Sequence, residues 1–179
     1  DAAYEVALTY GVPKPQAGDL DRAVAALQTL AVEFPTHAKA KIARFLEASC
    51  YRHVGRSEDA LQSLREFLAD TDDPDLVEIA QARAMVGDVL VGQGKLGEAI
   101  AAWQEYLKAH PAHRAWERVQ RAIVDAEYAS AQRAFESGRD KKGAERQASF
   151  VEARRLLTRF SEQHPLDARN PNILFSFGE

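Results

Sequence analysis

The chain has 179 residues, of which 46% are hydrophobic and 28% are charged, a composition that excludes a disordered chain and supports a core without disulfides or metals. Its net charge of -4 argues against non-specific nucleic-acid binding, because that function needs a large basic surface. The single cysteine, Cys50, cannot form an internal disulfide, and no apolar run approaches the roughly 20 residues of a membrane span. This composition fits either the cytoplasm or the periplasm.

Proline and glycine divide the chain into a series of predicted helices. Alanine, leucine, arginine, glutamate and glutamine are plentiful and favour helix, and no run of alternating apolar and polar residues predicts a strand. Asp, Ser and Thr mark helix starts, while Pro and Gly mark helix ends. The expected helices cover about residues 2–10, 19–34, 36–54, 57–69, 73–92, 96–109, 113–137 and 144–163, and a ninth begins at Asn170 and Pro171.

A small residue recurs at the same place in successive helix pairs. Four and seven residues after each recurring alanine stand large apolar residues, and three of the four units then close with a proline. The alanines are Ala23, Ala60, Ala99 and Ala153. An alanine at this position allows two helices to cross closely, and the large residues on the same face fill the space beside it. This pattern predicts helical hairpins that bury their apolar faces by stacking on one another.

The sequence resembles the tetratricopeptide repeat family, most clearly from Ala80 to Pro111. This segment has the family's small residue in the first helix, its Gln-Gly turn, an aromatic residue in the second helix and a closing proline. These residues are Gly87, Gln93, Gly94, Trp103 and Pro111. The resemblance implies an all-α superhelix of about four hairpins, with residues 1–179 as one repeat domain that we expect to be a segment of a longer array. A simple antiparallel helical bundle is the alternative architecture.

A second segment, Lys41 to Asp72, matches the same family but lacks the closing proline. The first unit matches only in its second helix, because Pro13 and Pro15 shorten the first one. Residues 33–51 are also similar to the repeats of bacterial envelope-assembly lipoproteins.

The resemblance implies a non-catalytic scaffold that binds a peptide or a protein face in a concave groove lined by the first helix of each repeat. Matched to this chain, the groove residues would be Phe45, Ser49, Arg52, His53, Gln81, Ala84, Asp88, Val91, Arg114, Glu117 and Arg121. This set mixes charges and does not reproduce the Lys/Asn/Arg clamp of some members. The resemblance to the family implies no cofactor, metal or catalytic residue. The alternative is a spacer arm of a larger protein with no ligand of its own.

Four clusters could carry chemistry, and each has a simpler structural interpretation. The acidic residues of 70–78 suggest a cation site, but Pro74 interrupts the spacing of a calcium loop, and a solvated loop fits better. His110 and His113 lack further zinc ligands at useful spacing and flank a proline turn. Cys50, with His53 one helical turn on, fits packing inside a helix, because no oxyanion site is evident. The run from Arg139 to Gly143 fits the tip of a long hairpin.

The C-terminal segment is strongly apolar. It contains Ile173, Leu174, Phe175 and Phe177, and it looks like the start of another repeat. Because an exposed apolar segment tends to find a partner, we expect it to pack on the eighth helix or to mediate self-association.

Overall fold

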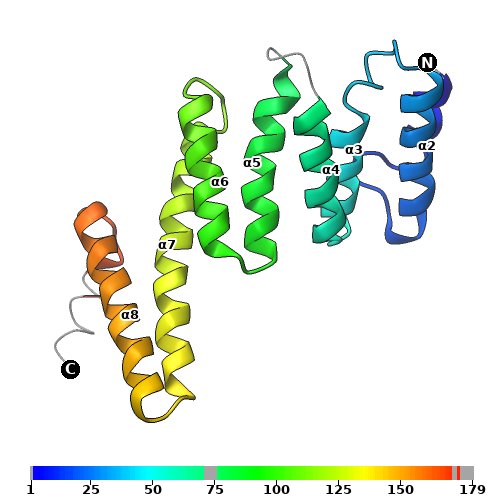
Figure 1. The fold of residues 1–179 in the computed structure, drawn as a ribbon. Helices are drawn as coiled ribbons and strands as arrows, with labels where there is room; N and C mark the ends of the chain where they lie inside the picture. Colours follow the sequence, from blue (N-terminus) through cyan, green and yellow to red (C-terminus); the bar gives the residue numbers. More distant parts are fainter. Residues whose placement is uncertain (1, 71–75, 171–172, 174–179) are drawn as a thin grey trace. The chain divides into compact units, whose positions relative to one another are not determined.

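The computed structural model of the chain describes residues 2–70, 76–170 and 173, and these residues form helices and turns without a strand (Figure 1). The elements are α1 (Ala2–Thr9), a short 3-10 helix η1 (Ala17–Asp19), α2 (Leu20–Glu33), α3 (Ala43–His53), α4 (Ser57–Asp70), α5 (Val77–Gly92), α6 (Leu96–Ala109), α7 (Trp116–Arg139) and α8 (Gly143–Gln163). The all-helical prediction is therefore confirmed. None of the described helices has both the length and the apolar character that crossing a bilayer requires.

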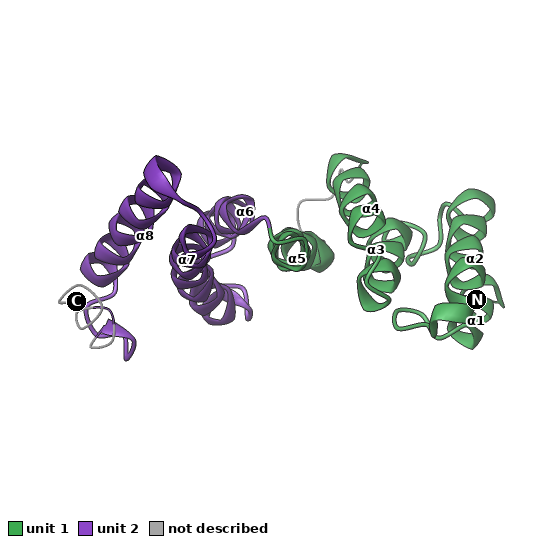
Figure 2. Ribbon diagram, turned by 90° about the horizontal axis from the view of Figure 1, so that it is seen from below, with its two compact units in different colours: residues 1–94 green, residues 95–179 purple. Residues whose placement is uncertain are grey.

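The chain divides into two compact units, residues 1–94 and 95–179 (Figure 2). In unit 1, α1 packs on α2, α2 on α3, α3 on α4 and α4 on α5. These contacts bury the apolar faces of the amphipathic helices α2, α3 and α4, whereas α5 is apolar on most of its surface. The core of this unit is aliphatic and aromatic, with Leu27, Leu30, Leu64 and Phe67 at most 2% exposed.

In unit 2, α6 packs on the long helix α7, and α7 packs along α8. Trp103, Tyr106 and Phe160 are among the large side chains buried in this unit, and Val119 of α7 is fully buried as well. All four alanines that define the sequence repeat are at most 1% exposed, namely Ala23, Ala60, Ala99 and Ala153. Their burial confirms that these positions face the interior.

Three loops share one hydrogen-bond pattern, although their sequences differ. They follow α2, α6 and α8 and contain the sequences Phe34-Pro35-Thr36-His37, His110-Pro111-Ala112-His113 and His164-Pro165-Leu166-Asp167. In each loop, the peptide N–H of the fourth residue donates to the carbonyl of the first, at 2.9, 3.1 and 3.0 Å. The side chain of the fourth residue then accepts from the peptide N–H two residues on, at 3.1, 3.4 and 2.9 Å. The recurring prolines therefore mark one repeated loop structure.

Four predicted helix bounds were wrong. The fifth helix begins at Val77 rather than at Asp73, because Leu76 before it is extended, with φ -64° and ψ 118°. The seventh helix begins at Trp116 rather than at about residue 113.

The third helix begins at Ala43 rather than at Thr36, because residues 35–42 form successive turns held by local bonds such as Ala40 N–H to His37 carbonyl. The seventh helix does not stop at Gly138, which is buried inside its last turn. A Cβ at this glycine would lie 3.0 Å from Cε1 of Phe150 and 3.1 Å from Cβ of Ser149. Gly138 thus allows α7 and α8 to approach closely.

Several predicted features lie outside the described residues. These are most of the acidic cluster and the C-terminal segment apart from Ile173. Ile173 itself is 2% exposed, and its N–H donates to the carbonyl of Arg169 at 3.3 Å.

Candidate functional site

The predicted groove residues of α3 are only partly accessible. Phe45 is 7% exposed, and its ring packs against Phe67 of α4 with the centroids 5.8 Å apart. Ser49 is half-buried and donates to the carbonyl of Phe45 at 3.0 Å. Arg52 and His53 are exposed at the C-terminal end of the helix. The burial of Phe45 assigns it to the core, and it leaves Arg52 and His53 as the residues of α3 that a partner could reach.

The predicted residues of α5 lie in the same unit, and α5 contacts α3. Ala84 is 3% exposed, whereas Gln81, Asp88 and Val91 are half-buried. Among the predicted groove residues of α5, the accessible surface therefore belongs to Gln81, Asp88 and Val91.

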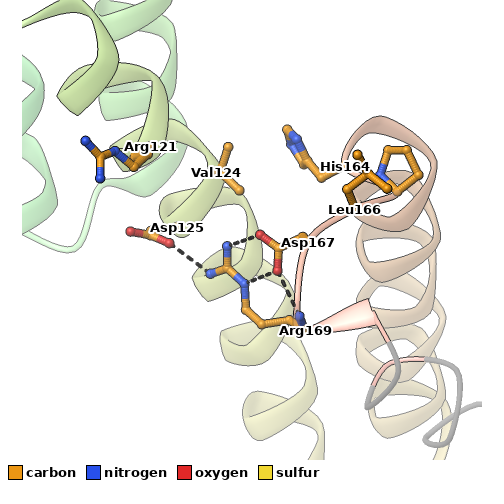
Figure 3. Close-up of a pocket in the computed structure, with 8 residues that line it drawn as sticks. Arg121, Val124, Asp125, His164, Leu166, Asp167 and Arg169 are labelled. Carbon is orange, nitrogen blue, oxygen red and sulfur yellow. Dashed lines mark hydrogen bonds and ion pairs between the residues drawn. The ribbon is translucent and has the colours of Figure 1, made fainter.

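The remaining predicted residues belong to unit 2. Glu117 and Arg121 are exposed on α7, whereas Arg114 lies in the loop before it, because α7 begins at Trp116. Arg121 lines a cavity of about 470 Å³ between α7 and the loop after α8 (Figure 3). The other lining residues are Val124, Asp125, His164, Pro165, Leu166, Asp167 and Arg169.

Arg169 organises one side of this cavity. Its guanidinium donates to both carboxylate oxygens of Asp167, each at 2.7 Å, and to Oδ1 of Asp125 at 2.9 Å (Figure 3). It also lies over the rings of Tyr128 and Phe160, 4.9 and 5.1 Å from their centroids. Hydrogen bonds from Arg169 lower the pKa of Asp167 to about 2, so this carboxylate stays ionised. The cluster fixes the loop against α7, and because one guanidinium is shared by two carboxylates this side keeps a net negative charge.

The other side of the cavity is open to solvent. Leu166 is 97% exposed, and Arg121 is exposed and has no partner among the residues that the structure describes. His164 is instead engaged, because its Nε2 lies 2.7 Å from a carboxylate oxygen of Glu127. The exposed aliphatic side chain of Leu166 and the unpaired guanidinium of Arg121 therefore border the same cavity.

Sequence reasoning identified Arg121 but missed the loop residues beside it. Leu166, Asp167 and Arg169 follow Pro165, which the sequence marked only as the end of a helix. The one available signal was that Pro35, Pro111 and Pro165 stand at the same place in their repeats. This equivalence predicts that the loop after Pro165 has the same fold as the other two loops.

The alternative chemical sites have structural explanations. Burial raises the pKa of the Cys50 thiol to about 12, so the group stays protonated at neutral pH and is a poor nucleophile. The Tyr106 hydroxyl and Nδ1 of His113 are hydrogen-bonded at 2.5 Å, and the Tyr106 and His110 rings pack 5.6 Å apart, so both histidines support the loop after α6. Within residues 2–70 and 76–170, no three His, Cys, Asp or Glu side chains converge on a possible metal position.

Antiparallel helix pairs with buried alanines and a repeated loop define a helical repeat protein. The family described as tetratricopeptide repeat-like domain matches residues 3–128, and the chain belongs to this family. The match ends within α7, so the distal part of α7 and all of α8 lie beyond it. No curated protein matches the chain. Membership of the family points to protein–protein interaction in general, and the similarity of residues 33–51 to envelope-assembly repeats stays a prediction.

Proposed function

We propose that the chain is a non-catalytic scaffold that binds a peptide or protein face along its exposed first-helix residues. In unit 1 these are the accessible side chains of α3 and α5. In unit 2 they include Arg121 of α7, which borders a cavity together with Leu166 of the loop after α8. The observation that carries the proposal is the pairing of Leu166, 97% exposed, with Arg121 at one cavity. Interfaces use such combinations of an apolar anchor and a charged residue at its rim.

The cavity favours a partner that brings an apolar side chain next to a carboxylate. The apolar side chain would cover Leu166 and Val124, and fully burying one leucine is worth roughly 2 kcal/mol. The carboxylate would pair with Arg121, which mainly directs the approach and fixes the register of the partner. Arg169 contributes less to recognition, because Asp125 and Asp167 already engage its guanidinium.

Site-specific photo-crosslinking tests this proposal in the native host. A photoreactive phenylalanine analogue replaces Leu166 in one variant and exposed Lys108 of α6 in a control variant. We expect a discrete protein adduct from position 166 and none from position 108, and we expect Arg121→Glu to weaken the adduct. Because both cavity side chains are exposed, these changes leave the core intact.

The opposite result would favour a different function. If position 166 gives no adduct and similar analogues at Arg52 and Gln81 give none either, the chain acts as a spacer arm without a ligand of its own. An adduct that forms equally from positions 166 and 108 would place binding away from the cavity.

A further inference from the structure

The helices of the α7–α8 hairpin are longer than the other helices of the chain that the structure describes. These helices have 24 and 21 residues, whereas the other α-helices have 8 to 16. Gly97, near the start of α6, lines the same small cavity as Ser130 of α7, so α6 begins near that level. From Ser130, α7 continues to Arg139, which is about 13 Å at the helical rise. Figure 1 shows this end of the hairpin extending past α6.

This distal end carries an apolar surface that its own hairpin does not cover. Phe135 of α7 is 48% exposed, and its ring lies 5.2 Å from that of Phe150 on α8. Val151, next to Phe150, is 61% exposed. A hollow of about 340 Å³ on α8 is lined by Gly143, Arg146, Gln147, Phe150, Val151 and Arg154. These positions recur every three or four residues, which is the spacing of a face that packs against another helix.

The charge around this surface is opposite to that of the chain. Residues 133–155 contain seven Lys or Arg and four Asp or Glu, a net charge of +3 in a chain whose net charge is -4. Arg146 lies over the Phe150 ring at 5.4 Å, which holds a cation at the edge of the hollow. The side chains of Lys142 and Arg139 form no ion pair or hydrogen bond with the described residues, whereas Arg155 is paired with Glu152 at 2.7 Å. An acidic partner would therefore be attracted to the hollow.

We propose that the distal end of the α7–α8 hairpin is a second docking surface, which binds a partner-protein helix carrying a bulky apolar side chain flanked by acidic residues. The apolar side chain would enter the hollow at Phe150 and Val151, and the acidic residues would meet Lys142 and Arg146. This surface is separate from the cavity beside Arg121, so the two proposals stand or fall independently.

The pattern of charges favours a protein over a polyanionic surface. Glu145 and Asp140 lie among the basic residues, and they would repel a membrane or a nucleic acid that presents uniform negative charge. A helix with discrete charges can place its carboxylates opposite the basic residues and away from these acids. A symmetric contact between this end of two copies is disfavoured, because two basic surfaces would meet.

The test measures binding of a designed peptide to the full chain by fluorescence anisotropy. The peptide forms an amphipathic helix of about four turns, with leucines on one face and glutamates beside them. A matched peptide has lysine in place of each glutamate. We expect saturable binding of the acidic peptide, weakening with added salt, and at least about tenfold weaker binding of the basic peptide.

Charge-reversal variants locate the binding. Lys142→Glu with Arg146→Glu should weaken the acidic peptide about tenfold or more, whereas Arg65→Glu with Lys108→Glu, which changes the net charge equally, should not. Val151→Ser should also weaken binding, whereas Val32→Ser, at an 80% exposed valine of α2, should leave it unchanged. Circular dichroism confirms that each variant is folded.

Three outcomes would overturn the proposal. The first is equal affinity for the acidic and basic peptides, and the second is equal loss in the hairpin and control variants. The third is preferential binding of phosphatidylserine vesicles or of a DNA oligonucleotide at the hairpin end, which would replace a protein partner by a polyanion.

Discussion

We predict opposite effects on the unfolding free energy when two helical glycines, Gly97 and Gly138, are replaced by alanine. At Gly97 of α6 an added Cβ meets no atom within 4 Å, so alanine should gain its helix propensity, about 0.5–1 kcal/mol. At Gly138 of α7 the Cβ would lie 3.0 Å from the Phe150 ring and 3.1 Å from Ser149 Cβ. The Ser149 atom can move only with the backbone of α8, so the overpacking, typically 1–3 kcal/mol, exceeds the propensity gain. We expect Gly138→Ala to lose about 1 kcal/mol.

Thermal and urea unfolding of the two variants measure this contrast. For a chain of this length, 1 kcal/mol corresponds to roughly 2–4 °C in Tm, so the two variants should differ by about 3–8 °C. Because repeat proteins can open locally, hydrogen exchange should show faster exchange at the α7–α8 end in Gly138→Ala. If Gly138→Ala were as stabilising as Gly97→Ala, the close approach of the two helices would be wrong.

Three further substitutions probe the core. Ala99→Leu should overpack a fully buried site and lower the unfolding free energy by about 1–3 kcal/mol in urea, and an unchanged midpoint would mean that the repeat register is wrong. Tyr106→Phe removes the hydroxyl that pairs with His113 and should lower stability by about 1 kcal/mol in the same assay, whereas no loss would show that this bond contributes nothing. Burial raises the pKa of the Glu47 carboxyl, which is 2% exposed, despite the opposing effect of Arg44, so this group destabilises the fold as pH rises through its folded pKa. Glu47→Gln should therefore stabilise the protein more at pH 7 than at pH 4, and a larger gain at pH 4 would contradict this sign.

The helical architecture could be predicted because its signals are local. Alanine at the recurring position and large apolar residues one and two turns later specify which face of each helix is buried, and Ala60, Leu64 and Phe67 confirm it. Helix ends were predicted well where a short turn follows, as at Gly55 and Gly94, which both adopt positive φ. Thr36 was wrongly assigned as a helix start, because the competing turns depend on the His37 side chain and backbone together.

The candidate site could be predicted less well than the fold. A repeat pattern assigns residues to a helix face but does not say how far a neighbouring helix covers that face, and Phe45 is buried by Phe67 for this reason. The cavity beside Arg121 also depends on how the loop after α8 folds back on α7. That arrangement rests on Arg169 binding Asp125, 44 residues away, and no local pattern reveals such a pair.

In the shared loop structure, one position contributes to the surface of the loop but not to the hydrogen bonds that fix its conformation. The hydrogen bonds that define each loop use main-chain groups and the side chain of the fourth residue, and the residue directly after the proline takes no part in them. That residue is Thr36, Ala112 or Leu166, and all three are exposed. Mutations there change what each loop presents to the solvent with little effect on folding. The three positions are therefore a natural starting set for a combinatorial library that alters partner choice, since each can vary independently of the scaffold.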